Sequence, residues 1–137
     1  PLSTLTDLLT RLDALKEFMQ HEVASSLAAA NKRIGNILRK SDLSDSNDIK
    51  DDLLLIDEEN NLFEEVRRCS IELDRLYASA DYTAALTLLA GLSGNIEAFF
   101  DKVMVMDEDL AVRRNRLNLL AELKGLFDRV ANLALLG

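Results

Sequence analysis

Cysteine, histidine, proline and tryptophan are nearly missing from this chain of 137 residues, and these absences exclude several kinds of site. One His and one Cys are too few for a metal centre, which needs several convergent ligands, and nothing pairs them as a nucleophile and its base. The lone Cys69 leaves no intramolecular disulfide. Five scattered glycines form no phosphate-binding loop. We therefore expect no catalytic residue, no metal site and no cofactor within these residues.

Little in the chain interrupts regular structure. Only one Pro and five Gly occur, and hydrophobic residues make up 48% of the sequence without strand-like alternation. A length of 137 residues suits one domain with a core and is short for two. We predict an all-α fold, a single bundle of five or six helices over residues 1–137. Because the chain opens on Pro1 rather than Met, we expect a fragment of a longer protein.

No stretch of the sequence suggests passage to or across a membrane. The N-terminus lacks a positively charged start followed by an apolar block. No apolar run approaches the roughly 20 residues that cross a bilayer. We expect no membrane span and a cytoplasmic location.

Negative charge dominates the chain as a whole but is unevenly distributed. The formal net charge of −8 argues at first against a nucleic-acid partner, which needs clustered Lys and Arg. Residues 41–65 alone contribute a net −9, whereas residues 21–40 carry a net +3. The global sign therefore excludes no local partner.

Apolar residues recur every three or four positions and predict helices over about residues 5–18, 21–39, 57–78, 81–91, 95–103 and from 107 onward. The expected buried stripe of the first helix is Leu5, Leu8, Leu9, Leu12, Leu15 and Phe18. The expected buried face of the last helix is Val112, Leu119, Leu120, Leu123, Leu126, Phe127 and Val130. Residues 40–52, rich in acids and turn formers, predict a solvated and flexible loop.

Local residue types also predict where helices begin and end. Asp81 stands at the start of the fourth helix, and Gly91 can end it in the left-handed conformation. Asn95 can cap the fifth helix, and Asp107 the last, with Glu108 and Asp109 in its first turn.

The second predicted helix carries donors on the face opposite its apolar stripe. Lys32, Arg33, Asn36 and Arg39 lie on or beside this face, and Lys40 follows. Such residues often only keep a helix soluble. Gly35, which costs about 1 kcal/mol relative to Ala inside a helix, indicates that another helix or a ligand approaches closely.

Three arginines of the last helix have different predicted places. At 100° per residue, Arg114 points to solvent and Arg113 lies at the edge of the apolar face, where it can reach a ligand. Arg116 falls on the apolar face and needs a partner, for which Asp101 and Asp109 are candidates. We interpret Arg116 as structural.

The apolar connector at residues 104–106 has two interpretations. Met106 can fold over Leu110 or Ala111 as a hydrophobic staple. Alternatively, Met104 and Met106 are exposed and form an adaptable docking surface.

Three segments together resemble the C-terminal region of the beta subunit of bacterial glycyl-tRNA synthetase. They are AAANKRIGNIL (28–38), ADYTAALTLLAGLSGNIEAFFD (80–101) and FFDKVMVMDEDLAVRRNRLNLL (99–120). The resemblance covers most of the chain from Leu12 onward, apart from the acidic loop. The DALR letters themselves are loose here, because residues 109–113 contain them with an insertion.

The resemblance implies an all-α, DALR-type anticodon-binding domain that grips the anticodon arm of glycine tRNA. It also implies an alpha subunit as partner in a hetero-oligomer, which uses ATP and Mg at a site on that alpha subunit. Together with the residue pattern, it makes five residues the candidate tRNA contacts: Lys32, Arg33, Asn36, Arg39 and Arg113. The alternatives are a helical subunit-docking module and the DALR domain of another synthetase, such as the arginyl enzyme.

Overall fold

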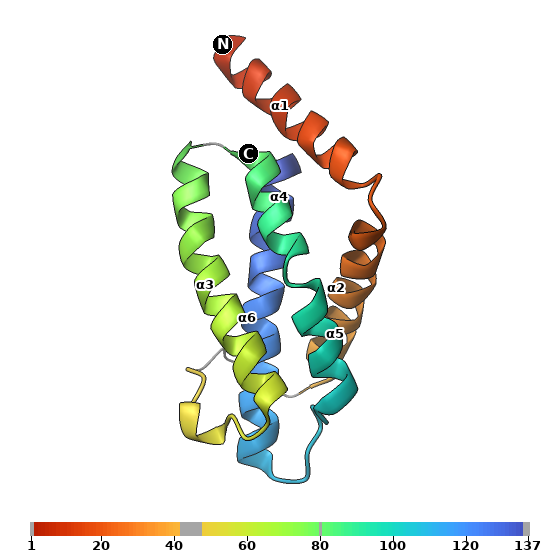
Figure 1. Ribbon diagram of the computed structural model, residues 1–137, viewed down its shortest axis with the longest axis vertical. Coiled ribbons are helices and arrows are strands. Elements are labelled where there is room, and N and C mark those ends of the chain that lie inside the picture. Colours follow the sequence, from red (N-terminus) through yellow and green to blue (C-terminus); the bar gives the residue numbers. More distant parts are fainter. Residues whose placement is uncertain (1, 42–47, 80, 136–137) are drawn as a thin grey trace.

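The computed structural model describes residues 2–41, 48–79 and 81–135, and all regular structure in them is helical. The elements are α1 (Leu2–Phe18), α2 (Glu22–Lys40), the short 3-10 turn η1 (Asp51–Leu53), α3 (Asp57–Ser79), α4 (Tyr82–Ala90), α5 (Ser93–Lys102) and α6 (Leu110–Leu135). The prediction of an all-α bundle of five or six helices is confirmed (Figure 1).

Helix α6 forms the centre of the bundle, where α1, α2, α3 and α4 all pack against it (Figure 1). Every residue of its predicted apolar face is buried, from Val112 to Val130. A broad apolar face on the longest helix is typical of an element covered from several sides.

Helix α3 packs against α4, α5 and α6, and its buried residues recur every three or four positions. Leu62, Val66, Cys69 and Leu73 are each at most 1% exposed. Burial raises the pKa of the Cys69 thiol, partly offset by the positive charge of Arg68. Cys69 is therefore a core residue, as a thiol on an apolar stripe usually is.

Helix α1 buries a different face from the one its leucines predict. Leu5, Leu8, Leu9 and Leu12 are between 38% and 53% exposed, so the prediction of a buried leucine stripe is wrong there. A different face of the helix contacts α4 and α6, and the N-terminal half of the helix extends past the end of the bundle (Figure 1).

Polar contacts with Tyr82 accompany this packing of α1. The hydroxyl of Tyr82 donates to Asp7 Oδ1 at 2.5 Å, and the Arg11 guanidinium lies 4.6 Å from the Tyr82 ring centroid. Ala14, one turn further along, is buried. The face that begins with Asp7 therefore turns inward, and the leucines turn toward solvent.

Helices α4 and α5 follow each other with only residues 91–92 between them. Gly91 has φ −64° and ψ −15°, so the expected left-handed end of α4 is wrong; the chain continues in nearly helical conformation into α5. Leu92 occupies the N-cap position of α5, which leaves Asn95 inside the first turn rather than at the cap. Asp81 does cap α4, since its side chain accepts from the Ala84 amide at 3.1 Å.

The start of α6 also differs from its prediction. Asp109, not Asp107, accepts from the helix amides, at 2.9 Å from Ala111 N and 3.4 Å from Val112 N. Asp107 accepts from the Asp109 amide at 2.9 Å and so shapes the preceding turn. The helix begins at Leu110 because this turn occupies the residues before it.

One segment, Tyr82–Lys102, is long and apolar enough to cross a membrane by length and composition, which corrects the expectation of no such run. In the structure it is divided into α4 and α5, and both pack against α3. Tyr82, Leu86, Ile96 and Phe99 are buried within the bundle. We therefore describe it as a core segment of this fold.

Candidate nucleic-acid interface

Arg116 holds together the end of the bundle that carries the candidate site. It is 2% exposed, its Nε and Nη2 donate to Glu59 at 3.0 and 2.9 Å, and its Nη1 donates to the Met104 carbonyl at 2.6 Å. Nη1 also lies 3.4 Å from Asp107 Oδ2. The structural interpretation of Arg116 is thus correct, but the expected partners Asp101 and Asp109 are not its partners.

The side chain of Asn115 on α6 binds the backbone of the segment before η1. Asn115 Oδ1 accepts from the Lys50 amide at 2.7 Å, and Asn115 Nδ2 donates to the Lys50 carbonyl at 3.1 Å. Ile49, next to Lys50, is buried. The predicted flexible loop therefore ends in an anchored segment at residues 48–53, whereas residues 42–47 lie outside the described residues.

A hollow of about 820 Å³ opens between the end of α2, residues 48–53 and the first half of α6. We call it the Asn118 hollow. Leu53, Met106 and Leu117 contribute apolar walls. Its charged lining residues are Lys40, Asp48, Lys50, Arg113 and Arg114. Four cations and one acid give this place a positive charge on a chain whose net charge is −8.

Asn118 lies in the wall of this hollow with an unsatisfied polar atom. The residue is 3% exposed, and its Oδ1 has no hydrogen-bond partner among the described residues. A buried polar atom without a partner costs about 1–3 kcal/mol. Such an atom in a native fold needs an explanation.

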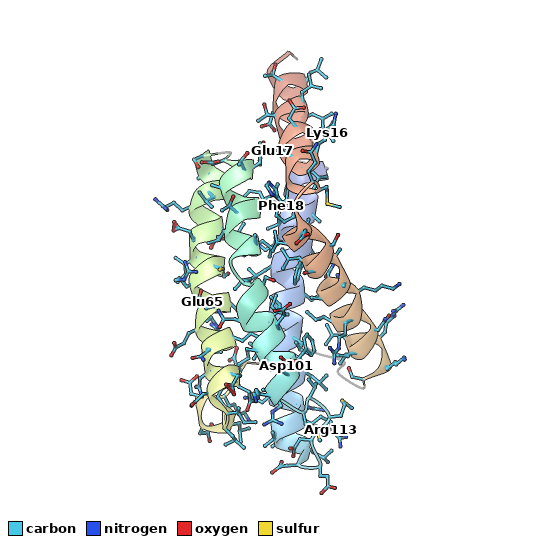
Figure 2. The ribbon with its side chains drawn as sticks, turned by 45° about the vertical axis from the view of Figure 1, so that its right-hand side comes forward. Lys16, Glu17, Phe18, Glu65, Asp101 and Arg113 are labelled. Carbon is cyan, nitrogen blue, oxygen red and sulfur yellow. The ribbon has the colours of Figure 1, made fainter. Side chains whose placement is uncertain are left out.

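A second, shallower hollow of about 330 Å³ lies on the outer face of α2, and we call it the α2 hollow. Lys32, Arg33 and Asn36 line it, as the face predicted from the sequence requires. Lys40 borders both hollows and connects them into one basic surface. In Figure 2, Arg113 marks the end of α6 that contributes to this surface.

Three of the predicted contact residues, all on α2, make contacts within the protein. The Arg33 guanidinium lies 4.1 Å from the ring centroid of Phe100 on α5, and Arg39 Nη2 donates to Asn36 Oδ1. Arg39 does not line either of the two hollows. These contacts hold Arg33 and Asn36 in place on the outer face of α2.

Arg113 is half-buried, and its Nε donates to the Asp107 carbonyl at 2.9 Å. This bond holds the guanidinium at the edge of the Asn118 hollow, in agreement with its predicted place beside the apolar face. Arg114 is exposed, as predicted, but it lines the same hollow and belongs to the candidate surface.

Sequence reasoning missed Lys40, Lys50, Arg114 and Asn118 as members of this surface. Lys40 was noted beside the basic face, and its position at the end of α2 was the available signal. Nothing in the sequence indicates Lys50, because it stands among acids and reaches the site only through the contact of its backbone with Asn115.

The hydrophobic staple predicted for the connector is wrong. Met104 and Met106 are 68% and 51% exposed, and Leu110 is 69% exposed. Val103 and Val105 are buried instead, so the connector alternates between core and surface. Exposure of both methionines is the outcome expected of a docking surface, although Met106 and Leu110 also line the Asn118 hollow.

Known proteins are similar to this chain over most of its length. The family described as the DALR anticodon binding domain matches residues 27–137. The glycine-tRNA ligase beta subunit of Pseudoalteromonas translucida is 44% identical over 126 residues, which are 92% of this chain and 18% of that relative. The beta subunits of Chromohalobacter salexigens and Ralstonia nicotianae are 44% and 43% identical over 98% and 95% of this chain.

Those two relatives are covered to 20% and 18% of their own length, so the chain spans about one fifth of the curated relatives it matches. The family match extends from Leu27, within α2, to the end of the chain and includes every residue that lines the two hollows. The chain therefore belongs to the family of DALR anticodon binding domains.

Proposed function

We propose that this domain binds the anticodon arm of glycine tRNA as part of the beta subunit of a cytoplasmic glycine-tRNA ligase. The family match and the names of the similar proteins support this assignment. The observation that carries it is the basic surface centred on Lys40, where two hollows meet on an otherwise acidic chain.

The residues of this surface divide by chemistry. Lys32, Lys40 and Lys50 are exposed and suit the phosphates of the RNA backbone. Asn36 and Arg113 are half-buried and held by neighbouring groups, which suits hydrogen bonds to the edges of unpaired bases. Loop bases that are not stacked or paired are the part of RNA that proteins read most directly.

The parent enzyme would use ATP and Mg, and we propose that both act on its alpha subunit. The residues of this chain do not fit a metal site, since no three His, Cys, Asp or Glu side chains converge within the part that the structure describes. The role proposed for this domain is to position the tRNA.

Anticodon binding is favoured over the alternatives. The exposed Met104 and Met106 fit a docking module, but the family match covers most of the chain and describes an anticodon-binding domain. The relatives are glycine-tRNA ligase subunits, which favours glycine over arginine as the amino acid.

Footprinting of glycine tRNA tests the proposed function. The tRNA is probed with the complete alpha and beta enzyme and with an enzyme that lacks residues 1–137 of this chain. We expect the anticodon arm to be protected by the first and not by the second, with protection of the acceptor end unchanged. Protection of the anticodon arm that survives the deletion would contradict the proposal.

A further inference from the structure

Two buried asparagines lie one helical turn apart on α6 and differ in their hydrogen bonds. Asn115 is 2% exposed and bonded through both amide atoms to the backbone of Lys50. Asn118 is 3% exposed, yet its Oδ1 has no partner among the described residues. Both side chains line the Asn118 hollow. Asn115 thus holds the Lys50 segment in the wall of the hollow, whereas the amide oxygen of Asn118 has no partner there.

Other unsatisfied buried atoms in the described part of the chain do not share this position. Asn31 Oδ1 and Arg11 Nε also have no hydrogen-bond partner there, but neither residue lines either hollow. Asn118 is the residue that combines an unpartnered buried amide with a place in a cavity wall. This combination points to a ligand in the hollow that hydrogen-bonds to Asn118 after its amide group rotates, because Oδ1 itself is shielded from solvent.

The walls of the hollow specify the chemistry of that ligand. Leu53, Met106 and Leu117 offer apolar contact to a flat group, and the volume of about 820 Å³ falls in the range of sites for small ligands, roughly 300–1,000 Å³. A planar ring with polar edges satisfies both the apolar walls and the amide. A nucleobase has these properties.

The charges around the hollow favour a base that is attached to a phosphate backbone. Lys40, Lys50 and Arg114 are exposed at its lining, and Asp48 is the acid there. A free neutral base would gain nothing from these cations, whereas a nucleotide within an RNA strand brings a phosphate on each side. The site therefore fits one residue of a single-stranded RNA segment.

We propose that the Asn118 hollow takes one unstacked base of an RNA loop and that the Asn118 amide pairs with the polar edge of that base. An amide presents a donor and an acceptor side by side, and either can face the hollow after a rotation of the group. The proposal rests on the proposed function, because the anticodon loop supplies the unpaired bases. It adds the place of one base and the residue that reads it.

A double-mutant cycle between the protein and the RNA tests this inference. The complete polypeptide that contains these residues is titrated with the anticodon stem-loop of glycine tRNA, intact or with one loop nucleotide made abasic at a time. For the unsubstituted protein we expect one abasic position to weaken binding by about tenfold. Asn118→Ala should weaken binding of the intact loop by a similar factor and remove the effect of that one abasic position.

Asn31→Ala is the matched control, because it removes another unpartnered amide that lies away from both hollows. We expect its Kd for the intact loop to be unchanged. Asn118→Leu, which fills the space with an apolar side chain, should weaken binding as Asn118→Ala does. Thermal unfolding measured by circular dichroism should give a Tm for each variant at or above that of the unsubstituted protein, because no intramolecular hydrogen bond through Oδ1 is lost.

The outcomes separate this inference from the function on which it rests. If the unsubstituted protein binds the stem-loop but Asn118→Ala binds equally well, the base site is wrong and anticodon binding stands. If every abasic position keeps its full effect in Asn118→Ala, the base site is likewise wrong. If the unsubstituted protein does not bind the stem-loop at all, the proposed function itself fails.

Discussion

Glu59 and Arg116 form a buried, two-point ion pair between residues 57 positions apart, with Arg116 Nε and Nη2 at 3.0 and 2.9 Å from the two carboxylate oxygens. Glu59 Oε1 also accepts from the amides of Leu55 and Ile56 at 3.2 and 3.1 Å, just before α3. The pair thus ties the start of α3 to α6 and, through the Met104 carbonyl, to the connector after α5.

Removing one partner of this pair should strongly destabilise the domain. Glu59→Gln leaves the buried Arg116 charge with Asp107 alone as counter-charge, at 3.4 Å and partly exposed, and we expect the free energy of unfolding to fall by about 3 kcal/mol. Urea denaturation measures the change. Asp128→Asn, which breaks an exposed pair with Lys124, is the control and should cost at most about 1 kcal/mol. Equal losses for the two variants would show that the buried pair has no special role.

The contact between Tyr82 and α1 should make stability depend on alkaline pH. Burial raises the pKa of Tyr82 above its ordinary value near 10, and the bond to Asp7 raises it further, while Arg11 opposes both. A raised pKa stabilises the fold below the ordinary value, and that stabilisation is lost as pH rises through the raised value.

Tyr82→Phe tests this dependence directly. At pH 8 we expect the variant to be less stable by about 1 kcal/mol, because the hydroxyl bond to Asp7 is lost. Above pH 10 the difference between the two proteins should shrink, since the unsubstituted protein has a phenol proton to lose at position 82 and the variant has none. Urea midpoints at several pH values give the comparison, and a difference that stays constant up to pH 11 would refute the linkage.

Gly35 leads to a stabilising substitution. A Cβ at this position would meet the Cε of Lys124 at 3.7 Å, an ordinary contact, so α6 is the neighbour and the close approach expected from the sequence does not require a glycine. Gly35→Ala should raise the free energy of unfolding by up to about 1 kcal/mol, because Ala favours a helix interior. A lower Tm for this variant would mean that α2 and α6 lie too close together at this position to admit a Cβ, which would contradict the 3.7 Å contact.

The orientation of α1 predicts unequal effects along one helix. Leu9 is 53% exposed, so Leu9→Gln should change the free energy of unfolding by no more than about 0.5 kcal/mol. Phe18 is partly buried and packs against the core. Phe18→Ala should therefore lower the free energy of unfolding by up to about 3 kcal/mol. If Leu9→Gln destabilises the domain as much as Phe18→Ala, the leucine face is buried and this orientation is wrong.

Periodicity predicted the helices and most of the core because both depend on residues a few positions apart. The buried face of α6 and the inward stripe of α3 follow from spacing alone. The structural role of Arg116 could also be predicted, since its place on an apolar face demands a partner. Its partner Glu59 could not, because the packing of α3 on α6 brings them together.

The candidate site was predictable only where it lies on one helix. Lys32, Arg33 and Asn36 share a face of α2 and line one hollow, as their spacing indicates. The Asn118 hollow is built from three segments that are distant in sequence, and its wall depends on the bond between Asn115 and Lys50. For α1, the leucine pattern did not predict the buried face, and the contacts of Asp7 and Arg11 with Tyr82 could not be predicted because they join residues far apart in the sequence.

The central claim is that RNA binds the basic surface around Lys40, and the salt dependence of binding tests it most directly. The affinity of the complete polypeptide for the anticodon stem-loop is measured over a range of salt concentrations for Lys32→Ala, Lys40→Ala and Lys16→Ala. Lys16 is an exposed lysine on α1, at the opposite end of the molecule from Arg113 (Figure 2). We expect Lys32→Ala and Lys40→Ala each to weaken binding and to reduce the slope of log K against log salt by about one, and Lys16→Ala to change neither. Unchanged slopes for Lys32→Ala and Lys40→Ala, or an equal change for Lys16→Ala, would contradict the account.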